Sequence, residues 1–189
     1  MKEILFEIMS RLMRMSKSKK IPLMFMGGLA TSVWAEPRAT YDVDGVIALE
    51  ETNLEQFFNE AVKEGFDFDR NQPVKIIQGF PFITLIYPAK KRHKVCVDLF
   101  LARSGYAKEA LSRLEEITFK GLKISVIAPE DLILYKLISG RSRDIDDVRE
   151  ILLTQKGRLK MKYLKKWAAR LGVITQLEDE ISSLFPDER

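Results

Sequence analysis

The chain has 189 residues, of which 46% are hydrophobic and 31% are charged, and its formal net charge is +4. These values place it in the ordinary range of globular proteins, with one domain or one domain and a helical tail. The sequence contains no stretch of about 18 apolar residues and no amino-terminal apolar run followed by a small-residue cleavage site, so we expect a cytoplasmic protein without a membrane partner. A single cysteine and a single histidine exclude an intramolecular disulfide and a Cys/His zinc cluster. Any bound metal must therefore be held by carboxylates.

The first forty residues show a helix, a short strand and a second helix. Apolar residues at helical spacing predict an amphipathic helix over residues 1–14. A short apolar run over 21–26 predicts a strand that ends in Gly27-Gly28, and a helix is expected over 29–36. A strand, a Gly-Gly turn and a helix therefore follow one another directly.

The following elements alternate between strand and helix up to residue 101. We predict strands over 40–49, 74–87 and 94–101, and a helix over 53–64 whose apolar residues share one face. We expect these strands to form a sheet.

Helical patterns dominate the rest of the chain. We predict helices over 106–117 and 129–138, a short strand over 122–127, and about three helices between 142 and 185. The pattern as a whole indicates an α+β fold with a mixed central sheet flanked by helices and a helical C-terminal part.

Three aspartates are the residues most suited to metal chemistry. Asp42 and Asp44 are separated by one residue on a predicted strand, so their side chains share a face and repel each other unless a cation lies between them. A Mg²⁺ ion would remove that repulsion because it prefers oxygen ligands, although a water-exposed strand face explains the pair equally well. Asp98 lies in an apolar strand where an unpaired carboxylate is costly to bury. On neighbouring strands the three would converge and could hold two metal ions.

Gly27 and Gly28 are the second candidate feature. Glycines allow a phosphate to approach the backbone closely, and the helix that begins there offers unpaired N–H groups to an anion. Without the downstream aspartates the pair would indicate only a turn.

Together, these motifs resemble a known signature. The segment MFMGGLATSVWAEPRATYDVDGVIAL is similar to that of the polymerase-beta-like nucleotidyltransferase superfamily, in which a hydrophobic residue and Gly-Gly precede an Asp-hydrophobic-Asp motif and a third carboxylate follows on a later strand. Here Gly27-Gly28 is followed after thirteen residues by Asp42-Val43-Asp44, and Asp98 is the third carboxylate. The sequence departs from the pattern at Gly45, where the family usually has an apolar residue.

A second segment narrows the resemblance to one branch. Residues 129–152, PEDLILYKLISGRSRDIDDVREIL, together with Arg38 before the acidic pair, resemble the small branch of abortive-infection nucleotidyltransferase toxins and related prokaryotic proteins. The resemblance implies that Lys136 is a catalytic or phosphate-contacting lysine and that Arg38, Arg141 and Arg143 bind nucleotide.

The residues themselves leave an alternative for part of this segment. Arg143 and Asp144 can equally form a local ion pair at the start of a helix, and we favour a structural role for Asp147.

The resemblance implies a nucleotidyltransferase fold with a catalytic core over residues 1–128 and a helical part over 129–189, or one compact domain. It implies transfer of a nucleoside monophosphate from an NTP to an acceptor by a two-metal mechanism. Asp42, Asp44 and Asp98 would be the ligands of Mg²⁺ or Mn²⁺, with Asp98 helping to deprotonate the attacking hydroxyl. Gly27 and Gly28 would cradle the triphosphate.

The sequence does not identify the acceptor, because a tRNA, a protein or a small molecule such as an aminoglycoside fits the same site. The resemblance to the toxin branch also implies a toxin-like role and a cognate antitoxin-like protein. One alternative is a non-catalytic nucleotide- or RNA-binding module on the same fold. Residues 11–20 and 156–170 are basic and suit a phosphate-rich partner, although each could be a solvated helix face. RNA binding by the helix around Lys160 to Arg170 is a third hypothesis.

Overall fold

The computed structural model describes residues 2–77, 79–88 and 94–186, and these form two compact units. Unit 1 comprises residues 1–29 and 39–127, and unit 2 comprises residues 30–38 and 128–189. Unit 2 therefore combines the C-terminal part of the chain with a nine-residue segment from the N-terminal half.

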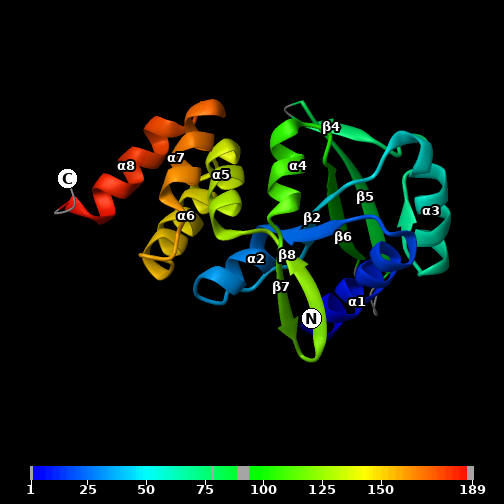
Figure 1. Cartoon of the computed structure of the whole chain (residues 1–189). Helices are drawn as coiled ribbons and strands as arrows, with labels where there is room; N and C mark the ends of the chain where they lie inside the picture. The colour runs from blue at the N-terminus through cyan, green and yellow to red at the C-terminus, as the bar shows by residue number, and fades with distance from the viewer. Residues whose placement is uncertain (1, 78, 89–93, 187–189) are drawn as a thin grey trace. The chain divides into compact units, whose positions relative to one another are not determined.

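Unit 1 is built on an eight-stranded mixed sheet with the strand order β3-β5-β6-β2-β1-β8-β7, and β4 pairs with β5 beside this path. Figure 1 shows β2 and β6 next to each other, and they run parallel. The strands are β1 (Leu23–Met26), β2 (Val43–Ile47), β3 (Asp67–Phe68), β4 (Lys75–Ile77), β5 (Phe80–Pro88), β6 (Lys94–Leu101), β7 (Glu115–Phe119) and β8 (Leu122–Val126).

The two faces of the central strands differ in burial. On β6 the residues Val95, Val97, Leu99 and Leu101 are buried, whereas the alternate positions are exposed or half-buried. Because successive side chains of a strand point to opposite faces, one face of the sheet forms the core of unit 1. The other face is free to carry polar groups, and Asp98 belongs to it.

Unit 1 also contains three helices and the start of a fourth. They are α1 (Lys2–Lys19), α3 (Leu54–Lys63), α4 (Gly105–Ser112) and the first residues of α2 (Gly27–Trp34), with a short 3₁₀ helix over Glu51–Asn53. The buried side chains of α1 recur at helical spacing, as an amphipathic helix packed on a core requires. At α4, the hydroxyl of Ser104 accepts a hydrogen bond from the Ala107 N–H at 3.0 Å and so caps the helix.

Unit 2 is helical. It contains the rest of α2 together with α5 (Pro129–Ser139), α6 (Ser142–Thr154), α7 (Met161–Arg170) and α8 (Ile174–Leu184). Pro129 stands at the first turn of α5, and Gly140 ends that helix in the left-handed conformation with φ +64°. The side chain of Gln155 donates a hydrogen bond to the carbonyl of Trp34 at 2.8 Å, which ties the segment 30–38 to α6.

The predicted fold class is confirmed, and several element boundaries are corrected. The helix predicted over 106–117 ends at Ser112, and β7 follows and pairs with β8 at one end of the sheet. The strand predicted over 74–87 consists of two strands, with Gly79 between them at φ +82°. In the part of the chain that the structure describes, no helix has the length and apolar character needed to cross a membrane.

Candidate active site

Asp44 and Asp98 lie side by side on the face of the sheet opposite the core of unit 1. In the parallel pair formed by β2 and β6, Asp44 is in register with Asp98. Residues in register on adjacent strands share a face, and adjacent strands lie about 4.8 Å apart, so the two carboxylates belong to one small polar area. On the other side of Asp44, Met26 is its partner in the antiparallel pair of β1 and β2. The end of β1, where Gly27 follows, is therefore next to the acids.

A threonine orients the Asp98 carboxylate. Thr84 is opposite Asp98 in the antiparallel pair of β5 and β6, and its hydroxyl donates a hydrogen bond to Asp98 Oδ1 at 2.7 Å. Among the described residues no donor to Asp98 Oδ2 is found, and the residue is only partly buried. One oxygen is thus held by the protein and the other is available to a ligand.

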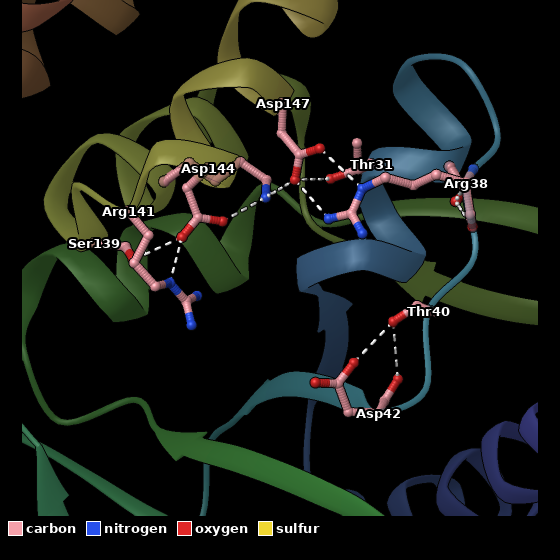
Figure 2. Close-up of polar contacts among 10 residues, drawn as sticks. Thr31, Arg38, Thr40, Asp42, Ser139, Arg141, Asp144 and Asp147 are labelled. Atoms are coloured by element: carbon pink, nitrogen blue, oxygen red, sulfur yellow. Dashed lines mark hydrogen bonds and ion pairs between the residues drawn. The ribbon is translucent and has the colours of Figure 1, made fainter.

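Asp42 precedes β2 and is exposed. The hydroxyl of Thr40 donates a hydrogen bond to Asp42 Oδ1 at 2.8 Å, as Figure 2 shows. Within the described ranges, no group of three Asp, Glu, His or Cys side chains lies close enough together to hold a metal ion in this structure. The structure therefore brings Asp44 and Asp98 together in register and places Asp42 two residues before Asp44, and the metal assignment stays a prediction.

Gly27 cannot carry a side chain because of Asp44. A Cβ built on Gly27 would overlap with Asp44 Oδ2 and lie 2.9 Å from Asp44 Cγ. Its φ of +62° is also a conformation that residues other than glycine rarely adopt. The acid thus lies against the backbone at the first residue of α2, and Gly28 follows in the first turn.

A second charged cluster lies within unit 2. Asp147 of α6 accepts two hydrogen bonds from the Arg38 guanidinium, from Nε to Oδ1 at 2.9 Å and from Nη2 to Oδ2 at 2.6 Å. The Lys136 ammonium of α5 donates to Asp147 Oδ2 at 2.5 Å and to Asp144 Oδ1 at 3.0 Å. Thr31 donates to Asp147 Oδ2 at 3.4 Å, and Figure 2 shows the Arg38 and Thr31 side chains directed at Asp147. We call these five residues the Asp147 cluster.

The two carboxylates of the Asp147 cluster remain ionised despite their burial. Burial raises the pKa of Asp147, but the hydrogen bonds from Arg38 and Lys136 outweigh it and leave the pKa below its ordinary value. Burial likewise raises the pKa of Asp144, and hydrogen bonds from Ser139, Lys136 and Arg141 reverse the shift. The cluster is therefore a set of compensated charges rather than a proton donor or acceptor at neutral pH.

Lys136 does not have the environment predicted for a phosphate-contacting or catalytic lysine. The residue is 4% exposed, and its ammonium lies between two carboxylates. To reach a phosphate it would have to give up its ion pairs with Asp144 and Asp147, which would keep their bonds from Arg141, Ser139, Arg38 and Thr31, and the loss of a partner from a buried ion pair is costly. In this structure Lys136 therefore takes part in a buried ion-pair cluster with Asp147, and its role in phosphate contact or catalysis stays a prediction.

The three arginines predicted to bind nucleotide differ in their exposure and in their hydrogen bonds. Arg141 donates from Nε to Asp144 Oδ2 at 2.6 Å, yet its side chain is 78% exposed. Arg143 is exposed on the first turn of α6. Arg38 uses Nε and Nη2 on Asp147, and the structure describes no hydrogen bond from its Nη1.

The chain is similar to a nucleotidyltransferase family model and to solved structures. A family model described as "Nucleotidyltransferase of unknown function (DUF6036)" matches residues 102–183. Among solved structures, an antigenic nucleotidyltransferase-like protein from Paracoccidioides brasiliensis is similar with a TM-score of 0.55 and 18% identity, over 95% of each chain. The antibiotic-resistance factor ANT(2'')-Ia is similar with a TM-score of 0.57 and 11% identity, over 94% of this chain and 98% of that one.

The chain has the nucleotidyltransferase fold. A candidate nucleotidyltransferase from Thermotoga maritima has the same fold, with a TM-score of 0.51 and 16% identity over 89% of this chain and 92% of its own. A comparison with proteins of curated function finds no match. These similarities support the superfamily resemblance inferred from the sequence, and they do not single out the toxin branch.

Two polar residues of this nucleotidyltransferase fold were missed in the sequence analysis. Thr84 is the one aliphatic hydroxyl in the strand FPFITLIYP, and that isolated small polar residue was a usable signal. Thr40 contacts Asp42 from two residues away, a local pattern typical of Thr beside Asp. Both contacts fix the orientation of an acid.

Proposed function

We propose that this protein is a metal-dependent nucleotidyltransferase that moves a nucleoside monophosphate from an NTP to a hydroxyl of an acceptor. The observation that carries the proposal is the in-register pair of Asp44 and Asp98 on one face of the sheet, with Asp44 against the backbone of Gly27. Like charges at that separation repel, and a divalent cation bound between the two carboxylates would remove the repulsion.

The donor set fits a hard divalent cation. Asp42, Asp44 and Asp98 supply only oxygen, the ligand type that Mg²⁺ and Mn²⁺ prefer, and one oxygen of Asp98 is not used by Thr84. We assign these three aspartates as ligands of Mg²⁺ or Mn²⁺, with two ions as the expected number. When bound, such ions neutralise the charge on the phosphates and polarise the phosphoryl oxygens.

The residues of unit 1 supply the remaining parts of the reaction. The acceptor oxygen forms a bond to the α-phosphorus while the bond from that phosphorus to the bridging oxygen breaks, so that pyrophosphate leaves. Asp98, oriented by Thr84, takes the proton of the attacking hydroxyl. Gly27 and Gly28 allow the triphosphate to approach the backbone at the N-terminus of α2, where N–H groups and the positive end of the helix dipole favour an anion.

Three arginines of unit 2 remain candidate nucleotide contacts. Arg141 and Arg143 are exposed, and Arg38 has Nη1 left after its two bonds to Asp147. Lys136 is the fourth candidate contact, and its ammonium would first have to give up its ion pairs with two buried carboxylates.

The acceptor and the biological role are also matters of proposal. The sequence-based acceptors are a tRNA, a protein or a small molecule, and the fold of ANT(2'')-Ia, which has been determined in complex with adenylyl-2''-tobramycin, supports testing an aminoglycoside. A toxin-like activity and an antitoxin-like partner follow only from the resemblance to the toxin branch, and a cytoplasmic location is proposed from the sequence alone.

The experiment is a transfer assay with each α-³²P-labelled NTP, Mg²⁺ or Mn²⁺, and total tRNA, cell lysate protein or tobramycin as acceptor. Asp44→Asn and Asp98→Asn should lower the transfer rate by at least about 10²-fold, because each removes a charged ligand of the metal ions that would neutralise the phosphates. The matched control is Asp146→Asn, since the side chain of Asp146 is 70% exposed on α6 and lies outside unit 1. Absence of label on every acceptor, with NTP binding intact, would replace the proposal with the non-catalytic module.

A further inference from the structure

The two basic stretches of the sequence differ in how far their charge is neutralised. In α1, Arg11 is paired with Glu7 at 2.8 Å, and Arg14 is paired with Glu64 at 2.7 Å. Lys19 lies 3.7 Å from Glu60. Much of the positive charge of residues 11–20 is therefore balanced inside unit 1.

Most of the positive charge of residues 156–170 has no such balance among the described residues. The stretch contains seven Lys or Arg residues and no Asp or Glu. Six of the cations are exposed and form no ion pair within the part of the chain that the structure describes. We call these six residues the α7 basic surface: Arg158, Lys160, Lys162, Lys165, Lys166 and Arg170.

Helical spacing concentrates this charge on one side of α7. Leu164 and Ala168 are fully buried and fix the inner side of the helix. Lys162, Lys166 and Arg170 follow one another at steps of four residues and therefore form a stripe on the outer side. The charged ends of Lys166 and Arg170 lie 5.9 and 5.2 Å from the centre of the Trp167 ring, contacts that restrict where those ends can point.

The nearby carboxylates of α5 are used to anchor α7 rather than to neutralise it. Glu130 and Asp131 are buried. Glu130 Oε1 accepts a hydrogen bond from the backbone N–H of Lys160 at 2.8 Å, and Asp131 Oδ1 accepts one from the hydroxyl of Tyr163 at 2.7 Å. Both acids thus act at the start of the helix, and the outer stripe stays cationic.

We propose that the α7 basic surface binds the phosphate backbone of RNA. A row of exposed cations is complementary to closely spaced phosphates, and binding of this kind releases counterions and tolerates different sequences. An anionic membrane is the less fitting partner, because a helix that lies in a membrane surface needs an exposed apolar face and α7 uses Leu164 and Ala168 for its own packing. Resting on the proposed function, the inference names RNA as the acceptor class.

The test measures the binding of a fluorescein-labelled single-stranded RNA by fluorescence anisotropy, without NTP, at several salt concentrations. The variant Lys162→Glu/Lys166→Glu/Arg170→Glu should bind at least tenfold more weakly. Its slope of log K against log salt should be smaller by about 2, since three lost phosphate contacts contribute about 0.7 each. The pair Lys162→Arg/Lys166→Arg should bind like wild type because it keeps the charge.

The matched control is Lys17→Glu/Lys20→Glu/Lys123→Glu, which changes the net charge equally at exposed cations of unit 1. Equal weakening by the control would show a general effect of net charge and overturn the proposal. Unchanged RNA binding by the α7 variant would also overturn the proposal. So would an α7 variant that no longer binds vesicles of phosphatidylglycerol and phosphatidylcholine but still binds RNA like wild type. Thermal melts followed by circular dichroism establish that each variant is folded.

The transfer assay separates this inference from the proposed function. Salt-sensitive RNA binding that depends on α7, with no label transferred to any acceptor, would support the surface and reject nucleotidyl transfer. Transfer to tobramycin or protein by a chain that does not bind RNA would reject the surface and support nucleotidyl transfer. Labelling of RNA by wild type, with at least a tenfold loss in the α7 variant at low RNA concentration, is the result expected if both hold.

Discussion

The Asp147 cluster yields a prediction about the stability of unit 2. Asp147→Asn keeps the size of the side chain but removes the charge that compensates Arg38 and Lys136. Removing one partner from a buried ion pair costs about 3–5 kcal/mol. Here the cost should lie nearer 2–3 kcal/mol, because Lys136 keeps its bond to Asp144 and the Arg38 side chain is partly exposed to water.

Urea unfolding followed by tryptophan fluorescence measures this change directly, because the only two tryptophans, Trp34 and Trp167, both belong to unit 2. The matched control is Asp146→Asn, one residue away on the same helix, whose surface pair with Arg149 spans 3.3 Å. It should change the free energy of unfolding by less than about 0.5 kcal/mol. A loss for Asp147→Asn that is no larger than that of Asp146→Asn would refute the reasoning.

Acid should remove the difference between wild type and Asp147→Asn. The folded-state pKa values of Asp144 and Asp147 lie below the ordinary aspartate value of about 3.9, so their contribution is complete above that value and is lost as the pH falls through the folded pKa. The gap between the two unfolding midpoints should therefore be largest at neutral pH and should narrow below about pH 4. A gap that widens in acid would contradict the direction of these shifts.

Two further predictions concern unit 1. Gly27→Ala should abolish transfer and destabilise the protein by more than Gly121→Ala, since both residues have positive φ but only Gly27 would bring a Cβ into the Asp44 carboxylate. The left-handed conformation costs each about 1–2 kcal/mol, and thermal melts with transfer assays isolate the additional clash. Thr84→Val should lower kcat about tenfold with little change in the KM for NTP, because it removes the bond that orients Asp98, and Thr84→Ser should restore kcat. A fall in NTP affinity alone would assign Thr84 a different role.

The residues of unit 1 were predictable because their signals are local. Gly27-Gly28 after an apolar run and two aspartates at alternate positions are visible within twenty residues of sequence. The placement of Asp98 needed one further assumption, that its strand pairs with that of Asp44, and the register of β2 and β6 bears out that adjacency. The roles assigned to these residues stay predictions.

The errors arose where distant contacts override local pattern. Residues 115–117 continue a helical spacing of apolar residues, yet they form β7 because β8 offers a pairing edge. The buried ion pairs of Lys136 were not predicted either: they come from positions 8 and 11 residues later on another helix, and the role in phosphate contact that the resemblance implies stays a prediction. Sequence spacing across the turn at Gly140 does not fix which side chains of two helices meet.

The segment 30–38 connects the Asp147 cluster to the candidate site along the chain. This segment belongs to unit 2 and is held there through Thr31, Arg38 and the carbonyl of Trp34. In sequence, however, it joins Gly27-Gly28 to the aspartates of the candidate site. The segment is therefore covalently continuous with the glycines on one side and with Asp42 on the other. A helical part that lacks every proposed metal ligand is thus connected through this segment to both stretches of chain on which the proposed chemistry depends.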